Sequence, residues 1–405
     1  MSMMECIPKI DEMIEARDDS AGTLTCGVEF EFLVPSIALL EPDPDPDIKD
    51  QKLYETVERH PAGIKNEVCE MLLETLRQLC DMPFRSMDDD EFVPPHENVV
   101  DYSSWRLGRD ITVNKDIDYY WSEGPYQWTG CELTSTVMSA TDYAEQINKI
   151  CRALKTVRIH LNQTTSVHVH VGRGDEPFSL LTIKKFVTLY WFTEKFFMEM
   201  HHPSRRDNKY CFRLTKFSNL AVKTRAELED EEDYLDAEGL NLMVRYVPQG
   251  SLPGPQRRQI RRIWGCADME EIAELMKKAP EGIPLSKAEG NRGSVGFRRF
   301  QPEGKTGGNI QTFEWRHMAG SLNEYHVNQW IKACVGFTDF CRVSEPAPFR
   351  GLVDHIVNIG EYYSGIELLQ MLRVDTRIFT DMLKAWAQDP NFCDDESGRE
   401  LFVPK

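Results

Sequence analysis

The chain has 405 residues, of which 41% are apolar and 28% are charged. That apolar content, with 8 Trp, 20 Phe and 13 Tyr, excludes a disordered chain and predicts a globular protein of about two to three structural units. Its 47 basic and 66 acidic side chains give a formal charge of -19, which repels phosphate backbones and anionic membranes. We therefore expect no nucleic-acid partner and no membrane partner.

The N-terminal segment carries no continuous apolar stretch, and no apolar run approaching ~18 residues follows anywhere in the chain. The 11 cysteines are an odd number without any CxxC pair, which favours reduced thiols over a disulfide framework. We expect a leader over residues 1–23 and a cytoplasmic location.

The first strand is predicted at GVEFEFLV, residues 27–34. Because side chains alternate along a strand, Glu29 and Glu31 share one face while Val, Phe and Phe share the other. The roots of the two carboxylates are roughly 7 Å apart. They repel one another if they lose water without gaining a cation.

Two further strands repeat this arrangement. GCELTS at 130–135 carries Glu132 on one face, and SVHVHVG at 166–172 carries His168 and His170 opposite three valines. Two imidazoles thus replace two carboxylates on the polar face of the second of these strands.

A fourth strand is predicted at TFEWRH, residues 312–317. Its aromatic side chains occupy one face, so Thr312, Glu314 and Arg316 share the other. A fixed guanidinium beside a carboxylate is suited to neutralising charge on a transferring phosphoryl group.

Three helices are predicted after these strands. One begins at Asp142, with Glu145 three places on as a capping partner. The second, over 180–200, is apolar on most sides and is expected deep in the core. The third opens with Ser321 and Glu324 as a capping box.

The remaining segments read as additions around this core. Alternating Pro and Asp at 42–47 exclude a helix or a central strand and predict a solvated loop. We expect insertions at about 41–100 and 220–290, and a helical extension over 345–405.

Taken together, the four strands carry four glutamates, two histidines and an arginine on the faces opposite their apolar side chains. An antiparallel sheet with one face in water explains each strand taken alone. However, a solvated face usually mixes Thr, Ser, Lys and Gln, whereas this face is rich in carboxylates. Carboxylates are hard ligands for Mg²⁺ or Mn²⁺, and Mg²⁺ usually also takes waters and substrate phosphates. The pattern predicts a shared metal basin that serves nucleotide chemistry.

One rival interpretation is a two-His, one-carboxylate iron site formed by His168, His170 and Glu314. It leaves the other three glutamates without a function. A second apparent motif, EGKTGG at 303–308, resembles a phosphate loop, but Arg299 stands where the Walker pattern requires glycine.

The ordered motifs resemble those of the amidoligase family, which belongs with ATP-dependent carboxylate-amine ligases of the glutamine synthetase and glutamate-cysteine ligase fold. The resemblance rests on GVEFEF (27–32), WRLGRD (105–110), GCELTS (130–135), SVHVHVG (166–172), HPSRRDNKYC (202–211) and TFEWRHMAGSLN (312–323). It spans residues 24–344 with the two insertions, and the C-terminal extension lies outside it.

The resemblance implies a role for each matching residue. The implied ligands for the metals that hold ATP are Glu29, Glu31, Glu132, His170 and Glu314. The residues implied to face nucleotide or substrate are His168, Arg316, Arg205, Trp105 and Asp110. The residues implied to be catalytic are Glu29, Glu314 and Arg316.

The resemblance also implies the reaction. A substrate carboxylate attacks the γ-phosphate of ATP, giving an acyl phosphate and ADP, and an amine then displaces phosphate to form an amide. Such transfers need positioning and cations more than a protein nucleophile. The acid and the amine are left open as small molecules, peptides or protein side chains, and a non-catalytic nucleotide-binding relative is a further alternative.

The expected fold is therefore α+β. A curved, mainly antiparallel sheet forms a funnel with its polar face, as in the glutamine synthetase-like catalytic domain, and helices cover its apolar face.

Overall fold

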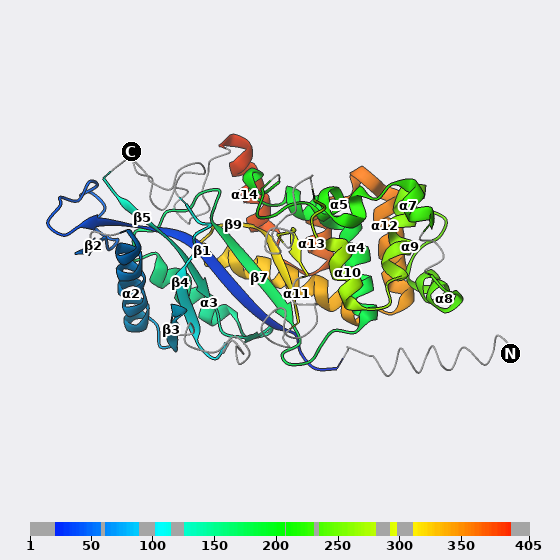
Figure 1. The fold of residues 1–405 in the computed structure, drawn as a ribbon, viewed down its shortest axis with the longest axis horizontal. Helices are drawn as coiled ribbons and strands as arrows, with labels where there is room; N and C mark the ends of the chain where they lie inside the picture. Colours follow the sequence, from blue (N-terminus) through cyan, green and yellow to red (C-terminus); the bar gives the residue numbers. More distant parts are fainter. Residues whose placement is uncertain are drawn as a thin grey trace.

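The computed structural model (Figure 1) describes residues 21–57, 61–88, 102–114, 125–206, 208–230, 235–280, 292–297 and 311–389. Several predicted features lie wholly or partly outside the described residues: positions 1–20 of the expected leader, parts of both expected insertions, the EGKTGG segment, and positions 390–405 of the expected extension.

The centre of the molecule is strand β1 (Thr25–Ala38), which pairs antiparallel with β5 (Gln127–Thr134) on one side and with β7 (Ser166–Gly172) on the other. Figure 1 shows β1 in blue and β7 in green running side by side across the middle of the molecule. The sheet order is β3-β4-β5-β1-β7-β9-β8, and β2 and β6 also pair with β1. The remaining strands are β2 (Tyr54–Thr56), β3 (Phe84–Ser86), β4 (Trp105–Arg109), β6 (Met138–Ser139), β8 (Val295–Gly296) and β9 (Thr312–Ala319).

Four helices pack on the apolar face of this sheet and on one another: α2 (Pro61–Leu79), α3 (Ala144–Leu154), α4 (Leu180–Glu199) and α11 (Glu324–Val343). The strand alternation produces this face, since Val28, Phe30 and Val169 are fully or almost fully buried. Phe186 of α4 stacks on Phe313 of β9 with ring centroids 3.7 Å apart. Full burial of one such side chain contributes about 1.5–3 kcal/mol.

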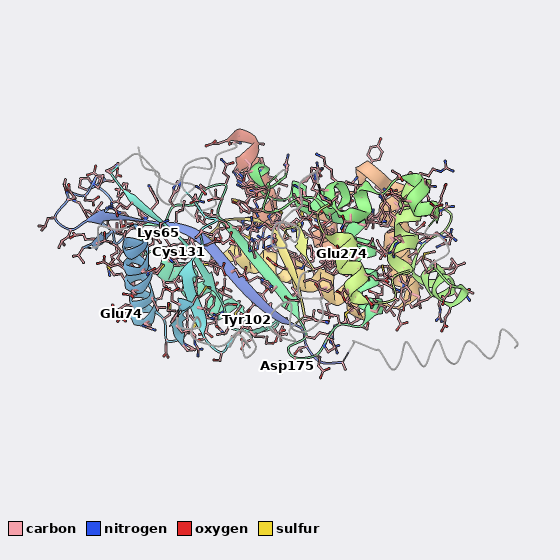
Figure 2. All side chains as sticks on the ribbon, viewed as in Figure 1. Lys65, Glu74, Tyr102, Cys131, Asp175 and Glu274 are labelled. Carbon is pink, nitrogen blue, oxygen red and sulfur yellow. The ribbon has the colours of Figure 1, made fainter. Side chains whose placement is uncertain are left out.

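The other helices lie mostly toward one end of the molecule, opposite β2 (Figure 1). Figure 2 marks this end with Glu274 on α10, and the other end with Cys131 on β5, whose Sγ is 3.9 Å from Cys69 Sγ of α2. None of the described helices is long and apolar enough to cross a membrane. These elements are α5 (Leu214–Phe217), α6 (Asn219–Val222), α7 (Arg225–Asp230), α8 (Ala237–Tyr246), α9 (Gly254–Trp264), α10 (Met269–Met276), α12 (Pro346–Ile359), α13 (Gly365–Met371), α14 (Arg377–Gln388) and the 3-10 turns η2 (Pro203–Arg205) and η6 (Gly360–Tyr362).

The predicted α+β class is confirmed, with a largely antiparallel open sheet in which only the described pairs β1–β2 and β3–β4 are parallel. The helix starts were predicted less well. Helix α3 begins after Tyr143 without a side-chain cap, and α11 is capped by Asn323, whose side chain accepts from two backbone N–H groups. Helix α11 begins at Glu324, so this residue is at the first helical position and not at the third that the predicted capping box requires; its carboxylate pairs with Lys155 at 2.9 Å.

The acidic Pro-Asp loop is not simply solvated, as its composition predicted. Arg158 is 1% exposed and donates to both carboxylate oxygens of Asp43 at 2.7 and 2.6 Å. Asp45 accepts from Tyr126 at 2.9 Å. A bidentate charged pair of this kind is short and directional, so the loop after β1 is fastened to the body of the protein.

Candidate metal centre on the polar face of the sheet

Strand register brings the polar side chains of four strands together. The described pairings place these residues directly opposite one another: Glu31 and Glu132, Glu29 and His168, and His170 and Glu314. Directly opposed side chains on one face start about 4.5–5.5 Å apart. The face that alternation predicted on separate strands is therefore one continuous surface.

Three residues from three strands form what we call the first ligand group: Glu29, His168 and Glu314. One ligand atom from each lies within 4.8 Å of the others. His168 Nδ1 is 3.1 Å from Glu29 Oε2 and 3.9 Å from Glu314 Oε1. Two carboxylates and one imidazole thus point at a common position.

The second ligand group consists of Glu31, Asp110 and Glu132, whose ligand atoms also lie within 4.8 Å of one another. Asp110 follows the last residue of β4, and its backbone N–H donates to Gly130 O at 2.9 Å. That contact with β5 turns the aspartate toward the two glutamates. Among the described residues this group holds carboxylates only.

The first group and Glu31 are largely shielded from solvent, and Asp110 and Glu132 are half-buried, which argues against an ordinary wet sheet face. The side chain of His168 is 1% exposed, that of Glu31 is 9% exposed, and Glu29 and Glu314 are 17% and 18% exposed. Carboxylates in such a site need cations or strong donors nearby.

The second group lacks enough cations of its own. Burial raises the pKa of Glu132 well above its ordinary value, and the charges of Glu29, Glu31 and Asp110 raise it further. Burial also raises the pKa of Glu31, although His168 and Arg316 oppose this effect. Three carboxylates that repel one another in a partly buried site form a donor set that a hard divalent cation fits.

The first group is better compensated. Burial by itself raises the pKa of Glu29, but the charge of His170 and hydrogen bonds from His168 and His170 outweigh it and hold the pKa well below its ordinary value. Burial likewise raises the pKa of Glu314, while Arg316 and His170 bring it below the ordinary value. This group is therefore ready to act as an anionic ligand set near neutral pH.

Arg316 lies beside the first group and is held in place from several sides. Its guanidinium donates to Glu314, and its Nε donates to Tyr210 O at 2.9 Å. Arg205 is 1% exposed and donates to the backbone carbonyl of Arg316 at 2.6 Å. Arg205 thus holds the backbone of β9 at Arg316, and its contact with substrate stays a prediction.

Two other predicted site residues lie outside both groups. His170 Nε2 is 3.0 Å from Glu29 Oε1 and its Nδ1 is 3.1 Å from Thr312 Oγ1, so it flanks the first group, and His168 is the histidine inside. Trp105 is fully buried on the apolar face and donates its indole N–H to Gln146 at 3.0 Å. From there it supports the core and does not face the polar surface.

One residue of the site was not predicted. Ser166 Oγ bonds to Glu31 Oε2 and lies 2.8 Å from His168 Nε2, so it connects the second group to the first. The sequence could have indicated this residue, because Ser166 is two positions before His168 and therefore lies on the same face of the strand. Ser166, His168 and Glu29 have the hydrogen-bond order of a Ser-His-acid triad, but Ser166 is 1% exposed and already held by Glu31, which argues against a nucleophile.

The comparisons with known proteins identify a family for the chain. Residues 22–242, more than half of the chain, match the family described as "Putative amidoligase enzyme". No curated protein and no solved structure matches the chain. A match over more than half of the chain shows the family, whose description is that of an enzyme.

The chain belongs to the amidoligase family. The matched residues include both histidines of β7 and all of the second ligand group. Glu314 and Arg316 lie beyond the matched residues, and the structure brings them to the same centre.

Proposed function

We propose that this protein is an ATP- and Mg²⁺-dependent carboxylate-amine ligase that forms an amide through an acyl phosphate. The observation that carries the proposal is the pair of adjacent ligand groups on one sheet face, with Arg316 beside the first. Mg²⁺ is typically bound through a few carboxylates plus substrate phosphates. Phosphoryl transfer between bound oxygens depends mainly on such positioning and charge stabilisation.

In the first step a substrate carboxylate oxygen attacks the γ-phosphorus of ATP. The bond from that phosphorus to the β,γ-bridging oxygen breaks, and ADP leaves with the electron pair. Arg316, fixed by Glu314 and by Tyr210 O, contributes a cation for the charge on the transferred group. Glu29, His168 and Glu314 would hold one Mg²⁺ or Mn²⁺ ion, and Glu31, Asp110 and Glu132 a second, and these ions would supply charge neutralisation for the phosphates.

In the second step an uncharged amine attacks the acyl carbon. The bond from that carbon to the phosphate oxygen breaks, and the phosphate leaves with the electron pair and carries away the proton lost by the amine. No protein nucleophile is needed, in agreement with the buried position of Ser166.

The same geometry disfavours the iron enzyme. A two-His, one-carboxylate site needs both imidazoles in the first coordination shell. Among the described residues, the first ligand group contains one imidazole and two carboxylates, and His170 instead bonds to Glu29 and Thr312.

The substrates proposed are a carboxylic acid and an amine, each a small molecule, a peptide or a protein side chain. The nine described cysteines are all buried and outside disulfide bonds, which supports a cytoplasmic location. The charge of -19 supports partners other than nucleic acids and membranes.

The first test is titration calorimetry of ATP binding with and without Mg²⁺. We expect binding that requires Mg²⁺ in the parent chain and is lost in Glu314→Ala. Glu145→Ala is the matched control, since Glu145 is an exposed glutamate of α3 that pairs only with Lys149 among the described residues. It should bind ATP as the parent does.

The second test is ADP release across a panel of acids and amines. Release that requires both substrates and Mg²⁺ is expected. Absence of Mg²⁺-dependent ATP binding by the parent chain would defeat the proposal. Binding without ADP release from any pair would identify a non-catalytic relative, and tightly held iron in the purified protein would favour the rival enzyme.

A further inference from the structure

The hydroxyl group of Ser166 links the two ligand groups, beside the direct approach of His168 Nδ1 to Glu31 Oε1 at 3.6 Å. Ser166 Oγ lies between Glu31 of the second group and Nε2 of His168 of the first, at 2.8 Å from the latter. His168 in turn directs Nδ1 toward Glu29 at 3.1 Å. Ser166 and His168 therefore connect the two groups through polar contacts of hydrogen-bond length.

The chemistry of these groups determines the direction of that line. A serine hydroxyl has one proton to donate, and a carboxylate held by a cation can only accept. Ser166 must then donate to Glu31 and accept from His168 Nε2. When an ion occupies the first group, the imidazole proton is consequently on Nε2, and the lone pair of Nδ1 is directed at that ion.

We infer that Ser166 is a positioning residue that couples the two cation sites, so that an ion in either group favours an ion in the other. This inference rests on the proposed metal sites but not on the ligase reaction. An ion on His168 Nδ1 fixes the proton on Nε2 and turns Ser166 toward Glu31. An ion on Glu31 fixes the same orientation from the opposite end.

The size of the effect follows from what outer hydrogen bonds do for metal ligands. Removing a group that orients a ligating histidine costs about 10–100-fold in metal affinity. Coupling between two sites is reciprocal, so the same factor acts in both directions. Removing the Ser166 hydroxyl should therefore lower the coupling about tenfold or more.

The experiment is a titration with Mn²⁺ alone, without nucleotide, with the free ion counted by its electron paramagnetic resonance signal. Glu314→Gln disables the first group, so the second group is measured with its neighbour empty. The ratio of its affinity in the parent to its affinity in Glu314→Gln gives the coupling. In the Ser166→Ala background this ratio should fall about tenfold.

The matched control is Thr134→Val. Thr134 Oγ1 donates to Glu132 Oε1 at 2.8 Å. Among the described side chains, it therefore supports a ligand of the second group and none of the first. Its loss should weaken that group and leave the ratio unchanged. Ser166→Thr keeps the hydroxyl and should retain the coupling of the parent.

A spectroscopic measurement covers the case in which Ser166→Ala fails to fold. In the Mg²⁺-loaded parent, the ¹⁵N shifts of His168, assigned with His168→Gln, should show the proton on Nε2. A proton on Nδ1 would overturn the inference.

The inference and the proposed function fail in distinguishable ways. An unchanged ratio in Ser166→Ala, with Mn²⁺ and ATP still bound, overturns the coupling alone. A parent chain that binds no Mn²⁺ overturns it together with the metal sites. A lowered ratio in a protein that releases no ADP supports the coupling and counts against the ligase.

Discussion

The fold of Glu132→Gln should be more stable than that of the parent when divalent cations are absent. It should be less stable than that of the parent when they are present. The carboxylates of Glu132 and Glu31 are directly opposed across β5 and β1, and with Asp110 their ligand atoms lie within 4.8 Å of one another. The amide keeps the acceptor oxygen for Thr134 and removes one of the three like charges.

The magnitude follows from Coulomb's law. Two unit charges at that separation repel by about 3.5 kcal/mol when the effective dielectric constant is about 20. Proton uptake already relieves part of this repulsion, because burial and the neighbouring charges raise the pKa of Glu132 well above its ordinary value. We expect Glu132→Gln to gain about 1–2 kcal/mol at pH 8 without Mg²⁺.

The stabilisation by Glu132→Gln should depend on pH, because the carboxyl group that it replaces titrates. A carboxyl with a raised pKa in the folded state stabilises the fold below its unfolded pKa, about 4.3, and loses this contribution as pH rises through the folded pKa. The gain from Glu132→Gln should therefore be near zero at pH 4 and largest at pH 8. Saturating Mg²⁺ should reverse the order, since an ion at about 100 times its dissociation constant stabilises the parent by about 2.7 kcal/mol.

The assay is thermal unfolding of both chains at pH 4 and pH 8, with EDTA and with Mg²⁺. A variant less stable than the parent at pH 8 in EDTA would refute the account of a repulsive carboxylate group. So would a stabilisation by Mg²⁺ that is the same in both chains.

Three further predictions concern the supports of the site. Asp43→Asn should lower the free energy of unfolding by about 3 kcal/mol in urea, because the buried guanidinium of Arg158 loses its carboxylate; a loss below about 1 kcal/mol would contradict this. Gly296→Ala should weaken Mn²⁺ binding at the first ligand group without changing the melting temperature, because the new Cβ would lie 2.8 Å from Glu314 Oε2; unchanged Mn²⁺ affinity counts against it. Glu194→Gln should destabilise the fold by about 1–3 kcal/mol on urea unfolding, because an amide cannot accept from both backbone N–H groups at the start of α5; a neutral effect would show that this carboxylate is dispensable.

The strand faces could be predicted from the sequence because alternation with a period of two is a local property. Glu29 and Glu31 had to share a face whichever strands became their neighbours. The apolar helix after β7 was equally local, since its composition alone demands burial.

The division into two groups could not be predicted, because it depends on pairing between strands. His168 and His170 are equivalent by alternation, yet only His168 enters a ligand group. The register between β7 and β9 shifts between Val167 and Val169: Val167 is paired with Met318 and Val169 with Trp315. The regular one-to-one pairing of the two strands is therefore interrupted at His168. Such a bulge redirects side chains and leaves no clear mark in sequence.

Asp110 and Arg205 show the same limit in loops and helix ends. Asp110 joins the second group through a backbone contact with Gly130, and Arg205 turns inward to a carbonyl of β9. Both positions were singled out in the sequence, but their partners are distant in the chain. Only the assembled fold distinguishes a ligand from a support.

Strand β1 carries one glutamate of each ligand group, two residues apart. The offset between these two ligands is therefore set by the repeat of an extended backbone, about 6.6–6.8 Å. Mutation can change the chemistry of either group but can alter this offset only in whole steps, because a shift by one residue would turn one of the two glutamates into the hydrophobic core. Strand β1 therefore fixes the spacing of the two ligand groups, and this spacing stays constant when the surrounding loops change.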